Sequence, residues 1–364
     1  MLKENNISHK LKKIIKAVIG LILVILSFIL FWIRPKNARK EDTATILVVK
    51  MERIGDMVLS MPAINELKAV FPKSRILLAV NSYISDIAKN DPHIDELLIY
   101  DKEKVGKGFP GKIKFIKNLR ARNFDLAVDL TTREFYFFPA FIVGLCRAKM
   151  KVGLDNNGRG FLFTNKVKPL SKPQYYPNEI MHILSPLGII AGQVKLKLCL
   201  SGNDQKYIDT YLSEREVNNA DNLIVIHPGG YYPEQHYRKY DFAKAIDYLI
   251  EKYAAKVFLI GAAGEQGLAD EIINMTKAKA KPFNAAGIFT LGQSMSLISK
   301  AKLFIGNSSG PLHAACALSV PTISFLSPDA AERWRPQGKN DITFDLSKTN
   351  LVDVISAIDN LILK

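Results

Sequence analysis

Apolar runs and amphipathic segments alternate along two stretches of the chain. A continuous apolar run is typical of a strand buried on both faces of a parallel sheet, and apolar residues every three or four positions indicate a helix packed on that sheet. The first stretch predicts strands over 45–50, 75–80, 96–99 and 126–129, and helices starting near 60 and over 84–89 and 112–122. The second predicts strands over 223–227, 256–260, 303–306 and 322–325, and helices over 242–253, 266–277, 291–299, 311–318 and 351–363.

This repetition predicts an α/β fold in which two Rossmann-like halves face each other. The pattern weakens over 150–185, rich in Gly, Asn, Lys and Pro, and over the polar segment 200–221, and we predict no elements there. We divide the chain into a basic segment with a membrane anchor (1–43), an N-terminal Rossmann-like domain (44–215), a C-terminal Rossmann-like domain (216–345) and a C-terminal helix (346–364). Ligands of such sheets bind beyond the carboxyl ends of the strands, so we expect a cleft between the halves.

The N-terminal segment has the pattern of a membrane anchor. Residues 17–33 (AVIGLILVILSFILFWI) carry no charge and are just long enough to cross a bilayer core. The alternative is a cleaved signal peptide, but no A-x-A site follows the run. Basic residues flank both sides, so the positive-inside rule does not assign the orientation.

Composition narrows the classes of partner. The net charge of the 364-residue chain is +15, of which nine Lys/Arg against three Asp/Glu in residues 1–43 supply +6. This balance favours lipid headgroups, phosphorylated glycans or nucleic acid. A nucleic-acid partner is not predicted, because the sequence has no aromatic-basic platform or known reader motif. The sequence also contains no H-E-x-x-H motif, no zinc spacing, no Walker loop and no G-x-G-x-x-G after the first strand. We therefore predict that the site binds no metal.

Three loops that follow predicted strands carry candidate chemistry. In MERIGD (51–56), Gly55 permits a tight turn, and Asp56 is either a catalytic carboxylate or a helix N-cap. In His227-Pro-Gly-Gly, the N–H groups of Gly229 and Gly230 would meet a phosphate, with a plain turn as the alternative.

The third loop is GNSSGPLH (306–313). Here Ser308, Ser309 and Gly310 lead into a helix whose N-terminus is suited to an anion, and His313 lies in its first turn. The alternative is a capped helix with a locally packed histidine.

Two weaker features accompany these loops. Glu265 follows another glycine-bearing turn and would accept hydrogen bonds from a ribose diol or favour a helix N-terminus. The stretch 102–122 is strongly basic and is either a solvated helix face or a patch for anionic lipid or a phosphorylated acceptor. The candidate acceptor or membrane patch consists of Arg53, Lys112, Lys114, Lys117 and Arg120.

Taken together, these segments resemble glycosyltransferase family 9, the bacterial heptosyltransferases. The resemblance rests on ILVVKMERIGDMVLSMPAINELKAVFP, IVIHPGG with YDFAKAI, VFLIGAAGE, and SLISKAKLFIGNSSGPLHAACALSVPTISFLSP, and covers roughly residues 45–340. It implies a GT-B fold with inverting, metal-independent transfer, in which a nucleotide sugar is the co-substrate and no cofactor is needed. The acceptor, a glycan or lipid-linked molecule, would contact the N-terminal half, and the donor the C-terminal half.

The resemblance also implies roles for individual residues. Asp56 would be the general base that deprotonates the acceptor hydroxyl, and Glu265 would bind the ribose. Backbone donors at Gly229, Gly230, Ser309 and Gly310 would stabilise the departing diphosphate. Because nucleotide sugars are made in the cytoplasm, we expect the catalytic domains on the cytoplasmic side of a bacterial inner membrane.

The sequence departs from the family pattern at two positions. Gln235 occupies the position where family members usually have a lysine that contacts the donor phosphate, and Arg238 or Lys239 could substitute for that lysine. Ser308 occupies a position where family members commonly have an aspartate. These departures leave open a transferase with another nucleotide sugar, or a non-catalytic, membrane-tethered relative that binds glycan.

Overall fold

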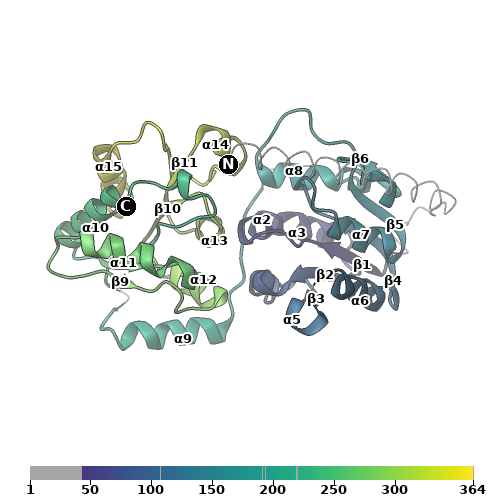
Figure 1. The fold of residues 1–364 in the computed structure, drawn as a ribbon, viewed down its shortest axis with the longest axis horizontal. Coiled ribbons are helices and arrows are strands. Elements are labelled where there is room, and N and C mark those ends of the chain that lie inside the picture. Colours follow the sequence, from purple (N-terminus) through teal and green to yellow (C-terminus); the bar gives the residue numbers. More distant parts are fainter. Residues whose placement is uncertain (1–42, 107, 191, 193, 219, 364) are drawn as a thin grey trace, which may run out of the picture.

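The computed structural model describes residues 43–106, 108–190, 192, 194–218 and 220–363. They form two α/β halves, each built on a six-stranded parallel sheet (Figure 1). The strand orders are β3-β2-β1-β4-β5-β6 and β12-β11-β10-β7-β8-β9. Both are the doubly wound dinucleotide-fold order, in which the direction of winding reverses next to the first strand. The predicted pair of Rossmann-like halves is confirmed.

The N-terminal half comes first along the chain. Its strands are β1 (Thr45–Val49), β2 (Arg75–Asn81), β3 (Glu96–Tyr100), β4 (Asn123–Asp129), β5 (Arg147–Leu154) and β6 (Asn165–Val167). Its helices are α2 (Ile54–Val58), α3 (Met61–Val70), α4 (Ser85–Ala88), α5 (Lys102–Val105), α6 (Gly108–Arg120), α7 (Phe138–Leu145) and α8 (Tyr176–Ile183).

The C-terminal half begins at residue 202. Its strands are β7 (Leu223–His227), β8 (Lys256–Leu259), β9 (Phe283–Asn284), β10 (Leu303–Asn307), β11 (Thr322–Leu326) and β12 (Asp341–Asp345). Its helices are α9 (Gly202–Ser213), α10 (Lys239–Tyr253), α11 (Gln266–Met275), α12 (Leu291–Ser299), α13 (Gly310–Ala317), α14 (Pro328–Trp334) and α15 (Leu351–Ile362).

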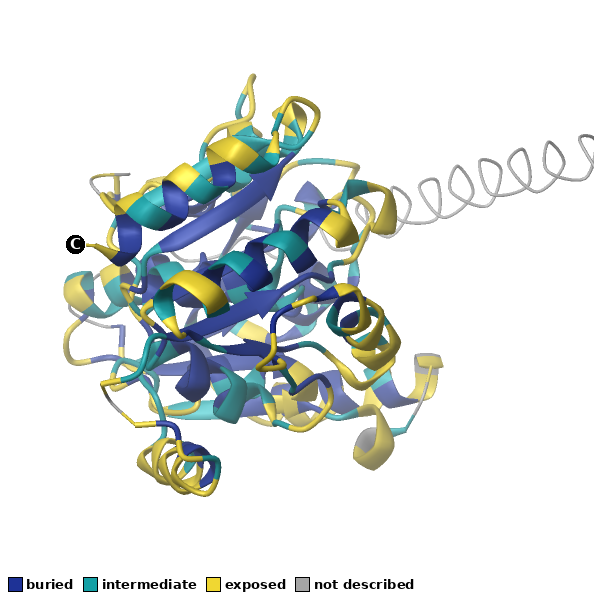
Figure 2. Ribbon diagram, turned by 90° about the vertical axis from the view of Figure 1, so that its left-hand side faces the viewer, coloured by how far each residue is buried: buried dark blue, intermediate teal, exposed yellow. Residues whose placement is uncertain are grey.

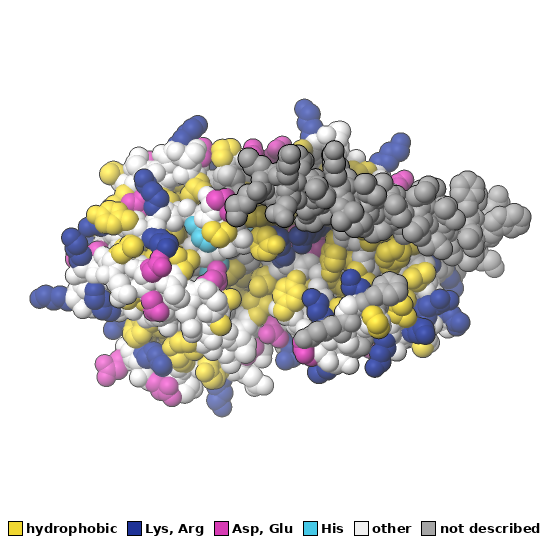
Figure 3. All heavy atoms as spheres, viewed as in Figure 1, with side chains coloured by type: hydrophobic (Ala, Val, Ile, Leu, Met, Phe, Trp, Pro, Cys, Tyr) yellow, Lys and Arg dark blue, Asp and Glu magenta, His cyan; other side chains and the backbone are white. Residues whose placement is uncertain are grey.

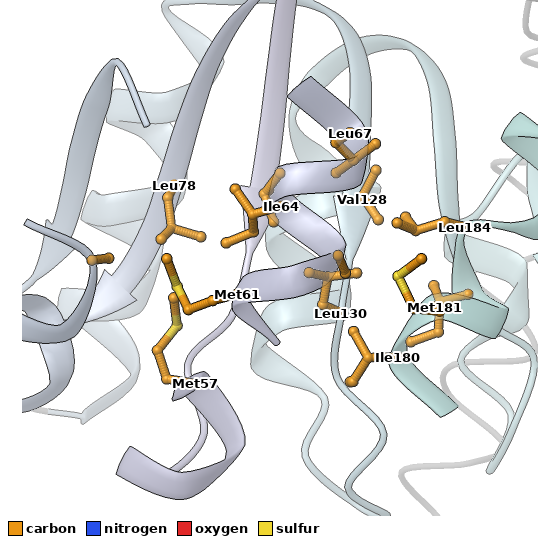
Figure 4. Close-up of a cluster of buried hydrophobic side chains, with 14 of the residues drawn as sticks. Met57, Met61, Ile64, Leu67, Leu78, Val128, Leu130, Ile180, Met181 and Leu184 are labelled. Atoms are coloured by element: carbon orange, nitrogen blue, oxygen red, sulfur yellow. The ribbon is translucent and has the colours of Figure 1, made fainter. Parts of the chain in front are cut away.

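Helices cover both faces of each sheet, and most residues of the central strands are buried (Figure 2). In the N-terminal half, α3 and α8 contact each other and α8 also contacts β5, so Ile64 and Leu67 of α3 share one core with Leu78 and Val128 of the sheet and with Leu184 (Figure 4). Each such aliphatic side chain contributes roughly 1.5–3 kcal/mol by leaving water. This core fixes the carboxyl end of β1, where the MERIGD loop begins.

Several helices and strands were not predicted from the sequence. The packing of helices α9 and α15 differs from the domain boundaries that we predicted at residues 216 and 346. Helix α9 falls in the polar segment 200–221 because it buries a narrow stripe, which includes Ile208 and Leu212, against the C-terminal half. That half therefore starts before residue 216. Helix α15 is no separate unit, since Val354 and Ile358 lie in the same core as α10.

The two halves contact each other directly. Helix α13 packs against α2, and Ala314 and Ala317 of α13 belong to the core of the N-terminal half. On α8 and α14, the rings of Tyr176 and Trp334 stack with centroids 4.3 Å apart. Arg333 forms a two-pronged ion pair with Glu179 beside this stack. An aromatic stack and a bidentate ion pair thus hold the edges of the cleft together.

No helix in the described ranges is long and apolar enough to cross a membrane. The anchor that we predict over residues 17–33 lies outside those ranges. On the face shown in Figure 3, Lys and Arg side chains lie mostly around the rim of both halves, and hydrophobic side chains fill much of the middle.

Candidate active site

A cleft of about 950 Å³ lies between the carboxyl ends of the two sheets. Loops after β1 and β4 form its N-terminal wall, and loops after β7 and β10 form its C-terminal wall. In each sheet these two strands are neighbours across the point where the winding reverses. That point is where open α/β sheets bind ligands.

Asp56 lies on the N-terminal wall as the third residue of α2, rather than as an N-cap. Arg53 is the N-cap, and its backbone N–H donates to the Asp56 carboxylate over 3.2 Å. The Ser60 hydroxyl donates to the Asp56 carbonyl over 2.6 Å. The carboxylate is thereby held in the first turn of α2 at the edge of the cleft.

A network of buried polar side chains lies next to Asp56 on the N-terminal wall. Lys50, fully buried, pairs with Glu52 and donates to the Tyr176 hydroxyl over 2.9 Å. Thr132 donates to the same hydroxyl over 3.1 Å. Because two neighbours donate to its oxygen, Tyr176 can give its own proton to the Asp56 carboxylate. Burial, the charges of Glu52 and Asp56, and the hydrogen bond to Asp56 raise the pKa of Tyr176, which keeps that proton in place.

The C-terminal wall is organised around Glu265 and His227. Glu265 accepts the N–H groups of Ala262, over 2.7 Å, and Gly230, over 3.2 Å. Its other neighbour, His227 Nε2, lies 3.4 Å away. Although burial opposes it, the hydrogen bond and charge of His227 lower the pKa of Glu265 to about 2. A Cβ on Gly229 would lie 1.8 Å from a Glu265 oxygen, so only glycine fits at this position beside the carboxylate.

This arrangement differs from our prediction for the His-Pro-Gly-Gly loop. The Gly230 N–H, predicted to meet a phosphate, donates to Glu265 instead. Glu265 was predicted to bind ribose, and its carboxylate holds this loop to the turn after β8. Gly229 does not line the cleft, whereas Gly230 and Glu265 do.

The β10 loop presents small polar residues to the cleft. Asn307 fixes it by donating to the Pro228 carbonyl over 2.7 Å and accepting the Tyr237 N–H over 2.8 Å. Ser309 is the N-cap of α13 and leaves the N–H groups of the first turn without a side-chain cap. Its hydroxyl lies 3.0 Å from His227 Nδ1. Ser308, Ser309 and Gly310 all line the cleft, next to a helix end that favours an anion.

His313 lies beneath this loop and carries no charge at neutral pH. It is buried between the halves, and a Cβ on Gly55 would lie 2.9 Å from its ring. Burial lowers the pKa of His313 to about 4, although the nearby Asp56 acts in the opposite sense. His313 therefore supplies no positive charge to a phosphate at pH 7.

The remaining predicted residues fall into two groups. Gln235 and Arg53 line the cleft. Arg238 pairs with Asp241, and Lys239 pairs with Glu271, so these cations turn away from the cleft. The basic residues of α6 are also outside it, namely Lys112, Lys114, Lys117 and Arg120. They share no site with Arg53.

Within the described residues, no three His, Cys, Asp or Glu side chains are grouped to hold a metal ion. The absence of a metal in the reaction stays a prediction.

The family model for glycosyltransferase family 9 (heptosyltransferase) matches residues 112–354. The chain belongs to glycosyltransferase family 9. It is similar to lipopolysaccharide heptosyltransferase 3 of Escherichia coli, with 27% identity over 335 residues that cover 85% of this chain and 96% of that protein. The same-named protein of strain K12 is 29% identical over 303 residues, covering 80% of this chain and 84% of that protein.

Solved structures of the family share this fold. A family 9 glycosyltransferase of Veillonella parvula superposes with a TM-score of 0.81 at 20% identity, covering 90% of this chain and 99% of that one. The E. coli ADP-heptose LPS heptosyltransferase II superposes with a TM-score of 0.74 at 20% identity, covering 88% of this chain and 98% of that one. The fold is therefore that of GT-B heptosyltransferases, and the chain is a heptosyltransferase-like glycosyltransferase.

Sequence reasoning missed several residues of the family 9 cleft. Thr132 and Arg133 lie in the loop that follows β4, a predicted strand, so the strand-end rule would have found them. Tyr176 and Trp334 lie in segments with no strong periodicity, and no sequence signal pointed to them. His227 was noted only as part of its motif.

Proposed function

We propose that this protein is an inverting, metal-independent glycosyltransferase that moves a heptose-like sugar from a nucleotide-sugar donor to a lipopolysaccharide-core or other cell-surface glycan acceptor. The sequence relatives named lipopolysaccharide heptosyltransferases support the substrate class. One observation carries the reaction type: across a single cleft, the Asp56 carboxylate faces the uncapped start of α13.

In the proposed reaction, the acceptor hydroxyl lies against Asp56. Asp56 takes the hydroxyl proton as the oxygen attacks the anomeric carbon of the sugar. The bond from that carbon to the diphosphate oxygen breaks on the opposite face, and its electrons leave with the nucleoside diphosphate. The N–H groups of Ser309 and Gly310, with the Ser308 and Ser309 hydroxyls, would stabilise the developing negative charge.

We further propose that residues 17–33 anchor the enzyme to the bacterial inner membrane, with the catalytic domains facing the cytoplasm. The support is the uncharged 17-residue run with basic flanks. An anchor on this side would place the cleft near both the cytoplasmic donor and a lipid-linked acceptor.

The test is a transfer assay with the full-length chain in mild detergent. ADP-heptose and truncated lipopolysaccharide acceptors that lack outer heptose are incubated with the protein, and the product is analysed by mass spectrometry. We expect one added heptose, undiminished by EDTA, with an anomeric configuration opposite to that of the donor by NMR. A retained configuration or a strict metal requirement would refute those parts of the proposal.

A panel of GDP- and UDP-linked sugars belongs in the same assay, because the neutral Gln235 lines the cleft. Transfer from one of these, and not from ADP-heptose, would assign a different donor. If no donor is turned over or bound by folded protein, the chain is a non-catalytic relative.

A further inference from the structure

The leaving diphosphate of the proposed reaction needs a positive charge, and the C-terminal wall provides little. Among the described residues that line the cleft, the basic side chains are Arg53, Arg133, Arg333, His227 and His313. Arg333 is neutralised by its ion pair with Glu179. His313 is uncharged at neutral pH, and His227 faces the Glu265 carboxylate. Arg53 and Arg133 remain, and both come from the opposite wall.

Arg53 differs from Arg133 in where its guanidinium is held. The Arg53 Cζ lies 3.6 Å from the ring centroid of Tyr231 and 5.8 Å from that of Tyr232. These two tyrosines directly follow Gly230 and pack edge to face, with centroids 4.8 Å apart. The cation of the N-terminal half is thus placed on the donor-side loop of the C-terminal half.

The stacking also leaves Arg53 able to bind a ligand. A guanidinium that stacks by its flat face keeps its N–H donors at the edge of the plane, where they fit two phosphate oxygens. Within the described part of the chain, Arg53 forms no ion pair that would neutralise it. The backbone of Arg53 is fixed as the N-cap of α2, three residues before Asp56.

We propose that Arg53 binds the diphosphate of the nucleotide donor from across the cleft. It would supply the positive charge that Gln235, Arg238 and Lys239 do not bring to the C-terminal wall. One short segment then carries both the base at Asp56 and the counter-charge of the leaving group. This inference rests on the proposed function.

The experiment compares nucleoside diphosphates with their monophosphates by calorimetry, using the full-length chain in mild detergent. ADP, GDP and UDP are titrated first into the wild-type protein. The nucleoside whose diphosphate binds most tightly is then used, as its diphosphate and its monophosphate, for all variants. Charge-assisted hydrogen bonds favour the diphosphate, so Arg53→Gln should weaken its binding about 10- to 100-fold. Binding of the monophosphate should change less than about threefold, because its contacts with the β10 loop remain.

Matched variants separate the possible results. Arg238→Gln removes the same charge from a residue that pairs with Asp241, and it should keep the wild-type preference for the diphosphate. Tyr231→Leu should lose part of that preference, because Arg53 is no longer held. If Arg53→Gln keeps the full preference, or if Arg133→Gln abolishes it instead, the inference is wrong while the proposed function stands. If folded wild-type protein binds no nucleotide, the proposed function itself fails.

Discussion

The two walls of the cleft are built from different chemistry, although both come from the same strand order. The N-terminal wall holds formal charges close together: Lys50 and Glu52 are fully buried beneath Asp56. The C-terminal wall offers small hydroxyls and backbone N–H groups, and its own carboxylate, Glu265, is satisfied by its neighbours. In the proposed reaction, the wall that would take the proton carries fixed charges, whereas the wall that would hold the leaving group is shaped by backbone and would be completed by Arg53 from the other half.

This difference makes the approach of the halves part of the site. Gly55 and Gly310 meet where α2 and α13 touch, and a Cβ on Gly310 would lie 2.5 Å from Ile54 Cγ2. A side chain larger than glycine at either position would therefore push the two walls of the cleft apart.

The largest effect is expected from Asp56→Asn, which keeps the shape of the N-terminal wall and removes the proposed base. Turnover should fall by roughly 10²–10⁴, the usual contribution of a positioned general base. Binding of the donor nucleotide, measured by calorimetry, should persist because it depends on the other wall and on Arg53. Turnover within a few-fold of wild type would remove Asp56 as the base.

A smaller effect is expected when the walls are pushed apart by Gly310→Ala. Overpacking of this kind costs roughly 1–3 kcal/mol, and we expect kcat/KM to fall about tenfold. Gly264→Ala is the control, since a Cβ there meets nothing within 4 Å. A Cβ on Gly310 would also lie 2.7 Å from Ile54 Cβ, so the double variant Gly310→Ala with Ile54→Gly is the one that relieves the overlap and should recover most of the loss. Without recovery, the defect would lie in the β10 loop itself.

The same contact shows what the sequence could and could not predict. Buried strands such as β1 and β7 were predicted because their apolar runs are continuous, and the loops that follow them contain Asp56 and Gly230. Strand β5 (RAKMKVGL) escaped because charged residues interrupt its apolar positions. That α2 lies on α13, or that Arg53 reaches Tyr231, depends on how the halves pack, and no local pattern encodes it.

A several-fold effect is expected from Tyr176→Phe, which keeps the stack on Trp334 and removes the hydroxyl between Lys50, Thr132 and Asp56. Without that hydroxyl the carboxylate loses a hydrogen-bond donor that orients it, so kcat should fall several-fold while the KM for the acceptor changes little. A merely structural role would lower the melting temperature and leave the kcat of the folded enzyme in place, so kcat and melting temperature measured together decide between the two.

The smallest effect at neutral pH is expected at His313, which connects the walls as an uncharged ring. Its pKa is lowered from 6.5 to about 4, because burial between the halves disfavours the charged form. Between these values the unfolded chain binds a proton that the folded chain does not, so stability should fall as the pH drops from 6.5 to 4. Above pH 6.5 this residue should contribute no pH dependence. Melting temperatures of the wild type and His313→Asn, compared across this range, should show a smaller loss in the variant. Parallel curves would mean that folding leaves the pKa of His313 unshifted, so that the ring takes up a proton in the folded protein as the pH falls below 6.5.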